Sequence, residues 1–326
     1  MKSKILRTLR ETDGFVSGQQ LCDTFGVSRT AVWKAIDNLK KEGYEIEAVR
    51  NKGYRLVKVS EQMSKEAIKS LLKTAWMGQQ VIYFDEIGST NNEAKAAGDK
   101  GGVDGTLFVA DMQTAGKGRR GREWKSPKGE NIYMSLLLRP QIAPDQASML
   151  TLVIALSLAQ AVREMLGLDV GIKWPNDIVI GGKKICGILT EMTCEITAIN
   201  YVVIGIGINV NQRKFPDDIK DTATSLTLEM GAAVDRSQLI ALTLQYFETN
   251  YELFVKEKSL RSLVDAYNEI CVNCGKRVRV LEPGNEYEAD SRGINEEGEL
   301  IVRTDDGKIR HIYAGEVSVR GIYGYV

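Results

Sequence analysis

The stretch QTAGKGRRGREW, residues 113–124, combines three glycines with four basic side chains. Glycines let backbone N–H groups turn toward one point, and the cations add positive charge there, so the stretch is suited to binding an anion. It contains G-x-G-x-x-G, but Pro127 and Gly129 disfavour the helix that a dinucleotide loop needs. No Gly-Lys pair precedes Ser or Thr, which excludes a P-loop. A solvated basic connector is the alternative interpretation.

A second group of polar residues is predicted in the same part of the chain. Asp177 follows KWPN at an expected strand end, and the turn Gly181-Gly182 presents Lys184 at the start of the next strand. The stretch YVVIGIGINVN ends with Asn209 and Asn211, whose amides can hydrogen-bond a ligand. For Asp177 we leave open a role in metal binding or lysine deprotonation, or simple pairing with Lys173.

The elements that must position these residues alternate between strands and helices from about residue 80 to 210. This pattern predicts a mixed α/β domain. The helix MLTLVIALSLAQAV is apolar on most of its surface, and we interpret it as a helix buried against the sheet rather than a membrane span. With 326 residues and 43% hydrophobic content, the chain is long enough for two or three domains.

The start of the chain mixes charged and apolar residues and does not resemble a signal peptide, and the odd number of cysteines, five, indicates reduced thiols. A cytoplasmic protein without membrane contact is therefore expected. Cys271 and Cys274 form C-x-x-C, but no second pair stands at zinc-finger spacing and His311 is the only histidine, so two core residues are the favoured interpretation. No protein-only metal site is predicted.

The first sixty residues predict a winged helix-turn-helix. Residues 1–59 hold twelve Lys/Arg and seven Asp/Glu, a charge of +5 in a chain whose total is zero. Ser17 and Ser28 can cap the second and third helices, and EIEAV and GYRLV predict a hairpin wing. A helical domain with a solvated basic face is the alternative. The predicted DNA-binding residues are Ser28, Arg29, Thr30, Trp33 and Lys34 on the third helix and Arg50 and Lys52 at the wing tip.

One helix-turn-helix per chain predicts a homodimer on DNA, because operator half-sites are matched by two-fold symmetry.

After residue 271 the short runs RVRVLE, EYEADSRGI, ELIVRT and KIRHIYAGEVSVR predict a small β-barrel-like module. The expected fold is therefore multidomain α+β. Its predicted parts are a winged helix-turn-helix at 1–62, a mixed α/β catalytic domain at 63–270 and a β-rich domain at 271–326.

In these motifs the chain resembles the biotin protein ligases that also repress the biotin operon. The resemblance covers the whole chain, and it implies a biotin/lipoate ligase-type catalytic domain and an SH3-like C-terminal domain. Its motifs are S-T-N at 89–91, Q-T-x-G-[KR]-G-R-x-G-R-x-W at 113–124, K-W-P-N-D at 173–177, K-[IL]-x-G-I-L at 184–189 and G-I-G-x-N-V at 205–210.

The resemblance implies two sets of ligand-binding residues. Lys117 stands where many relatives carry arginine. A lysine at this position keeps the charge but cannot contact phosphate in the bidentate geometry of arginine. The segment 212–224 resembles a loop that orders around adenine. The implied biotin-binding residues are Ser89, Thr90, Asn91, Gln113, Gly116, Lys117, Gly118, Arg119 and Lys184. The implied adenylate or ATP residues are Arg119, Arg122, Trp124, Lys184, Asn209 and Asn211, and the implied catalytic residues are Arg119, Lys184 and Asp177.

The implied activity is an ATP-dependent ligation that forms AMP and pyrophosphate, with Mg²⁺ entering with ATP. Biotin is activated to biotinyl-5'-AMP and transferred to a lysine of a biotin carboxyl carrier protein, as in acetyl-CoA carboxylase. The adenylate is the implied corepressor for a dimer on the operator DNA of biotin genes. The alternatives are a DNA-binding biotin sensor without ligase activity, and a ligase for lipoate or another acyl group.

Overall fold

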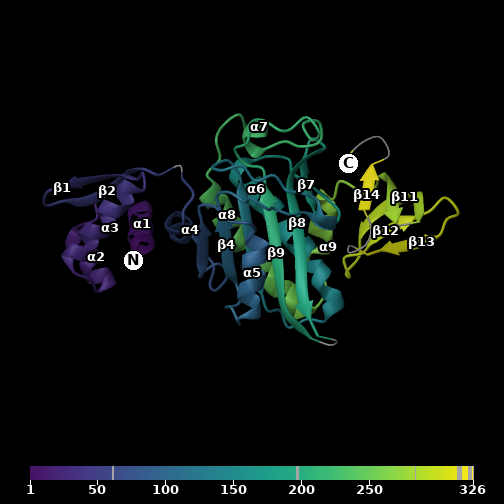
Figure 1. The fold of residues 1–326 in the computed structure, drawn as a ribbon, viewed down its shortest axis with the longest axis horizontal. Coiled ribbons are helices and arrows are strands. Elements are labelled where there is room, and N and C mark those ends of the chain that lie inside the picture. The colour runs from purple at the N-terminus through teal and green to yellow at the C-terminus, as the bar shows by residue number, and fades with distance from the viewer. Residues whose placement is uncertain (61, 196–197, 283, 314–317, 322–324, 326) are drawn as a thin grey trace. The chain divides into compact units, whose positions relative to one another are not determined.

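The structure is a computed structural model that describes residues 1–326 except 61, 196–197, 283, 314–317, 322–324 and 326 (Figure 1). The chain forms two compact units. The first contains Met1–Lys73 with Asp235–Ala241, and the second contains Thr74–Val234 with Leu242–Val326. The domain boundaries expected after residues 62 and 270 stay predictions.

The first unit is a three-helix core with a two-stranded wing. Its elements are α1 (Lys2–Glu11), α2 (Gly18–Phe25), α3 (Arg29–Lys41), β1 (Glu45–Val49), β2 (Gly53–Lys58) and α4 (Lys65–Leu71). Ser17 accepts a hydrogen bond from the backbone N–H of Gln20 and forms a capping box, and Gly26 ends α2 in the left-handed region with φ 63°. Ser28 accepts from the N–H of Ala31 at 3.2 Å. The predicted caps are thus confirmed.

The wing is antiparallel, and it is joined to the helices by a close backbone approach. Val16 and Tyr54 exchange backbone hydrogen bonds of 2.8 and 2.9 Å. A Cβ added at Gly53 would lie 2.0 Å from the carbonyl oxygen of Val16, so this position requires glycine. Arg7 of α1 donates to the backbone carbonyls of Lys69 and Leu72, both at 2.8 Å, and so links α1 to the end of α4.

The second unit contains a seven-stranded sheet of order β3-β4-β5-β9-β8-β7-β6. β3 and β4 are parallel and the other pairs are antiparallel, which confirms the mixed α/β fold. The strands are β3 (Val81–Phe84), β4 (Thr106–Ala110), β5 (Ile132–Leu138), β6 (Gly171–Lys173), β7 (Asp177–Ile180), β8 (Lys183–Cys194) and β9 (Ile199–Ile208). The helices are α5 (Thr90–Asp99), α6 (Met149–Leu166), α7 (Leu226–Met230), α8 (Arg236–Glu257), which begins in the first unit, and α9 (Val264–Ile270), with short 3₁₀ turns at Arg119–Gly121 and Pro144–Ser148.

The two faces of this sheet are covered by different helices. On one face, Ala94 of α5 packs in a cluster with Phe108, Leu137 and Val203 from three neighbouring strands. On the other, α6 buries most of its side chains, and its Thr151 hydroxyl lies 2.7 Å from that of Thr190 on β8. Alternate residues of a strand point to opposite faces, so this arrangement decides which strand residues reach the α5 side.

The long apolar helix lies in the interior, as expected. The segment Pro144–Leu166 is long and apolar enough to cross a membrane by length and composition, but 72% of its apolar 18-residue window is buried inside the protein. The core-helix interpretation accounts for this burial.

A smaller antiparallel sheet of order β13-β12-β11-β10-β14 follows. It confirms the predicted β-rich C-terminal part. The strands are β10 (Arg277–Glu282), β11 (Asn285–Ile294), β12 (Leu300–Arg303), β13 (Ile309–Ile312) and β14 (Ser318–Gly321). The predicted last segment, KIRHIYAGEVSVR, thus comprises two strands, and its residues 314–317 lie outside the described residues.

Candidate ligand-binding and catalytic site

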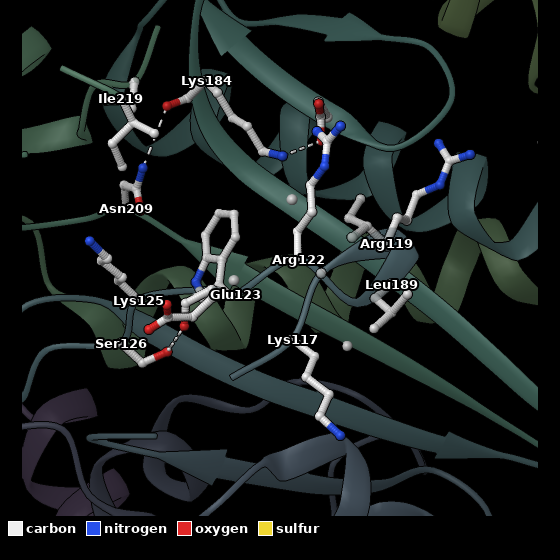
Figure 2. Close-up of a pocket in the computed structure, with 18 of the residues that line it drawn as sticks. Lys117, Arg119, Arg122, Glu123, Lys125, Ser126, Lys184, Leu189, Asn209 and Ile219 are labelled. Atoms are coloured by element: carbon white, nitrogen blue, oxygen red, sulfur yellow. Dashed lines mark hydrogen bonds and ion pairs between the residues drawn. The ribbon is translucent and has the colours of Figure 1, made fainter. Parts of the chain in front are cut away.

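A cavity of about 1570 Å³ in the second unit brings most of the expected site residues together (Figure 2). It lies on the α5 side of the sheet, where Leu189, Gly205 and Gly207 line it. Residues separated by more than 100 positions in the chain therefore share one space. The expected residues that line it are Ser89, Thr90, Asn91, Gln113, Lys117, Gly118, Arg119, Arg122, Trp124, Asp177, Lys184 and Asn209.

One end of the cavity is a network of neutral polar side chains at the start of α5. Gln113 accepts hydrogen bonds from the backbone N–H of Thr90 at 2.9 Å and from its hydroxyl at 3.1 Å. Its amide nitrogen donates to Ser126 at 3.1 Å. The Ser135 hydroxyl lies 2.7 Å from that of Thr90 and 2.6 Å from Oδ1 of Asn91. Such a preorganised set of donors and acceptors can satisfy a small polar ligand group.

A charged pair behind Asn91 fixes its orientation. Asn91 is buried, and it donates to Glu191 at 2.8 Å, while Lys95 donates to the same carboxylate at 2.7 Å. Burial raises the pKa of Glu191, but the hydrogen bonds from Lys95 and Asn91 outweigh it, and the net pKa lies below the usual value. Glu191 is therefore a carboxylate that holds the Asn91 amide in one orientation.

Trp124 forms a wall over the glycines of the sheet. A Cβ at Gly207 would lie 2.5 Å from the indole nitrogen of Trp124, and one at Gly187 would lie 3.0 Å from the ring. The backbone N–H of Trp124 donates to the carbonyl of Gly116 at 2.9 Å. A Cβ at Gly116 would lie 2.5 Å from the Trp124 carbonyl oxygen, so Gly116 permits the loop to fold back on itself, although it does not line the cavity.

The cationic side chains of the basic loop, residues 113–124, point in different directions. Figure 2 shows Lys117, Arg119 and Arg122 spreading away from the loop backbone. Arg119 is half-buried and donates to Oδ1 of Asn176 at 2.8 Å. Burial lowers the pKa of its guanidinium, while the nearby Asp177 carboxylate opposes this effect. A partly desolvated guanidinium next to a cavity interacts strongly with an anion that displaces water there.

Lys184 and Asp177 form an ion pair at the same end. Lys184 Nζ lies 2.6 Å from Asp177 Oδ1 and 5.3 Å from the centre of the Trp124 ring. The predicted turn is present, because Gly181 and Gly182 have φ values of 54° and 78°. Asp177 therefore has Lys184 as a side-chain partner, and Lys173 and Asp177 face each other as backbone partners of β6 and β7.

The two asparagines after β9 have different surroundings. Asn209 lines the cavity, and its amide donates to the carbonyl of Thr224 at 3.1 Å. Asn211 does not line it: its Oδ1 accepts from Thr227 at 2.6 Å, and its Nδ2 donates to the carbonyl of Val234 at 3.0 Å. The structure thus gives Asn211 contacts that hold the chain before α8.

The segment 212–224 closes one side of the cavity. Its backbone forms hydrogen bonds with both backbone groups of Lys184. The Lys184 N–H donates to the carbonyl of Thr222 at 2.8 Å, and the Thr224 N–H donates to the carbonyl of Lys184 at 3.0 Å. Phe215 and Pro216 supply an apolar surface to the cavity. This segment therefore lies beside Lys184 and forms part of the cavity wall.

Sequence reasoning gave no site role to several residues that line the cavity. Lys173, Asn176 and Tyr325 line the cavity. Lys173 and Asn176 belong to the motif KWPND, which was the available signal for them. Tyr325 is separated from Asp177 by 148 positions, and no sequence pattern indicated its place.

Mg²⁺ that enters with nucleotide phosphates would find a carboxylate in the cavity. Among the described residues no group of three or more His, Cys, Asp or Glu side chains is arranged to hold a metal. Mg²⁺ is commonly bound by one or two carboxylates together with phosphates and waters, and Asp177 is a carboxylate within the cavity.

The first unit presents the expected DNA-binding side chains to solvent. Arg29, Thr30 and Lys34 are exposed, and Trp33 has an exposed fraction of 57%. The Ser28 hydroxyl is used to cap α3. Arg50 and Lys52 are exposed at the wing tip. Helix and wing thus offer cations and hydrogen-bonding groups from two elements.

These features define a class: an enzyme with an anion-handling cavity joined to a winged helix-turn-helix. Comparison with known families agrees, since residues 86–209 match the Biotin/lipoate A/B protein ligase family, 2–55 an HTH domain and 274–320 the Biotin protein ligase C terminal domain. Together with relatives of 43% and 32% identity that cover 94% of this chain, these matches show that the chain belongs to the family of bifunctional biotin protein ligases and repressors.

Individual relatives support this membership along nearly the whole chain. Bifunctional ligase/repressor BirA of Bacillus subtilis is 43% identical over 309 residues, which is 94% of each chain. BirA of Escherichia coli is 32% identical and covers 94% of this chain and 93% of its own length. The biotin protein ligase from Aquifex aeolicus, solved in complex with biotin and ATP, is 32% identical with a TM-score of 0.66 and covers 74% of this chain and 99% of its own.

Proposed function

We propose that this chain activates biotin with ATP to biotinyl-5'-AMP and transfers biotin to a lysine of a biotin carboxyl carrier protein. The observation that carries the proposal is one cavity that joins the neutral polar network of Thr90, Asn91 and Gln113 to the cations Arg119 and Lys184. The ureido head of biotin suits the first end, and the carboxylate and phosphates suit the second.

The first step joins two anions. An oxygen of the biotin carboxylate attacks the α-phosphorus of ATP, a new P–O bond forms, and the bond to pyrophosphate breaks. Arg119 and Lys184 offset the repulsion and the developing negative charge, and Mg²⁺ entering with ATP supplies further neutralisation of the phosphates. The protein supplies orientation and charge, so no nucleophilic side chain is required.

The second step transfers biotin. The ε-amine of the acceptor lysine attacks the carbonyl carbon of the mixed anhydride, an amide bond forms, AMP leaves with the electron pair of the broken C–O bond, and the amine loses a proton. Trp124 and the segment 212–224 cover the cavity and limit access of water to the anhydride.

We further propose that the adenylate is the corepressor of this protein. Binding of biotinyl-5'-AMP favours a homodimer, which places two copies of α3 on the two halves of an operator of biotin genes. The exposed face of α3 and the basic wing tip support DNA contact. ATP, DNA and the carrier protein are all cytoplasmic, and the proposed location is therefore the cytoplasm.

ATP–pyrophosphate exchange tests the ligase half of this proposal. Purified protein with Mg²⁺ is assayed with biotin, lipoate or octanoate as the acid. We expect exchange with biotin only, and a fall of about 100-fold or more when Arg119 is replaced by Ala. Lys128→Ala is the matched control, because Lys128 is exposed and does not line the cavity. Exchange with lipoate or octanoate would indicate a different acyl ligase, and none with any acid would indicate a sensor.

A gel-shift titration tests the repressor half. We expect operator affinity to rise with biotinyl-5'-AMP and with protein concentration in the manner of a dimer. Equal affinity with and without the adenylate would contradict the corepressor role.

A further inference from the structure

Tyr325 brings a late part of the chain into the cavity. It lines the cavity, and its hydroxyl donates a hydrogen bond to Asp177 Oδ2. The ammonium of Lys173 lies 3.3 Å from the centre of its ring. Leu281 of β10 also lines the cavity, so two residues that follow the catalytic sheet in the chain take part in its wall. The Lys173 ammonium over the ring and the hydrogen bond of the hydroxyl to Asp177 together fix the position of the Tyr325 side chain.

The carboxylate that Tyr325 contacts is shared with Lys184. Asp177 Oδ1 pairs with Lys184 Nζ at 2.6 Å, while Oδ2 accepts from Tyr325. The Asp177 and Lys184 side chains retain only 14% and 25% of their exposure. A carboxylate held at both oxygens has little freedom to rotate, and the ammonium paired with it is held in place by the same contacts.

Resting on the function proposed above, we propose that Tyr325 is a positioning residue of the ligase site. It acts through Asp177 on Lys184, the cation expected at the carboxyl end of biotin. The phenol fixes the Asp177 carboxylate, and Asp177 fixes the Lys184 ammonium at the place where negative charge develops. Because small displacements of a reacting cation reduce the rate more than they reduce binding, the contribution of Tyr325 lies in the chemical step.

Tyr325→Phe is the direct test, because it removes the hydroxyl and keeps the ring over Lys173. We expect kcat of biotin-dependent pyrophosphate exchange to fall about tenfold, which corresponds to about 1.4 kcal/mol of activation free energy, with KM for biotin and ATP changed by less than about twofold. Tyr313→Phe is the matched control: Tyr313 is exposed, follows β13 and lies outside the cavity lining, so we expect wild-type kinetics.

A double-mutant cycle separates positioning from a general structural effect. Tyr325→Phe is compared in the wild-type and Asp177→Ala backgrounds by single-turnover formation of radiolabelled biotinyl-5'-AMP, which follows slow variants for hours. If Tyr325 acts through Asp177, its replacement changes the rate by less than about twofold once Asp177 is absent. Equal falls in both backgrounds, a rise in KM without a fall in kcat, or no change would overturn the inference. An inactive wild type would instead overturn the proposed function.

Discussion

Replacement of Gly205 by alanine is expected to disrupt the polar end of the cavity. Gly205 lies on β9 directly across from Ser135 of β5. An added Cβ would lie 2.1 Å from Oδ1, 2.7 Å from Cγ and 2.8 Å from Nδ2 of Asn91. Because the added Cβ is too close to both the oxygen and the nitrogen, a flip of the Asn91 amide does not remove the clash. Reaching ordinary contact at 3.4 Å requires Asn91 to move by about 1.3 Å.

The size of the effect follows from the hydrogen bonds that this movement breaks. Asn91 would lose the 2.6 Å contact with Ser135 and the 2.8 Å bond to the Glu191 carboxylate. A neutral hydrogen bond contributes about 1 kcal/mol and one to a charged group about 1.5–3 kcal/mol. Together they correspond to about 3 kcal/mol. If the same amide helps to bind biotin, the dissociation constant for biotin is expected to rise by about 100-fold.

Isothermal titration calorimetry with biotin measures this change directly. Gly88→Ala is the matched control, because Gly88 directly precedes Ser89 and a Cβ there meets nothing within 4 Å. We expect Gly88→Ala to bind biotin as the wild type does. Wild-type affinity in Gly205→Ala would refute the placement of the biotin head beside Asn91.

Two further predictions concern charge. Glu191→Gln is expected to lower the unfolding free energy of the second unit by about 1 kcal/mol at pH 7, since the contacts are partly exposed. The folded pKa of Glu191 lies below the usual value of a glutamate, so this stability is present above the unfolded pKa and is lost as pH falls through the folded pKa. Urea midpoints of variant and wild type should converge as pH falls through the folded pKa, and a pH-independent difference would contradict this. In the first unit, Lys34→Ala is expected to weaken operator binding and reduce its salt slope by about one, whereas Lys100→Ala, an exposed lysine of the other unit, should not; an unchanged slope would exclude a phosphate contact by Lys34.

Local signals allowed much of the fold to be predicted. The serine caps and the Gly181-Gly182 turn act over a few residues, and the structure shows each of them where the sequence placed it. Alternation of strands and helices likewise indicated the mixed sheet. These features depend on residues that are neighbours in the chain, so they can be predicted from a single sequence.

The contacts that hold the site residues in place could not be predicted in the same way. Glu191 contacts Asn91 across 100 positions and Tyr325 contacts Asp177 across 148, and neither pairing follows from local spacing. Asn209 and Asn211 were treated alike, but β9 ends at Ile208, after which the alternation of a strand no longer decides where side chains point. Tertiary register, which one sequence does not specify, determines these contacts.

The most direct test of the central claim is the identity of the molecule formed in the cavity. Purified protein is incubated with biotin, ATP and Mg²⁺, separated from free ligands and denatured, and the released compound is analysed by mass spectrometry. We expect about one biotinyl-5'-AMP per chain, lost in Arg119→Ala and retained in Lys128→Ala. Release of biotin alone from the wild-type protein would show that the cavity binds biotin without activating it, and would contradict the account.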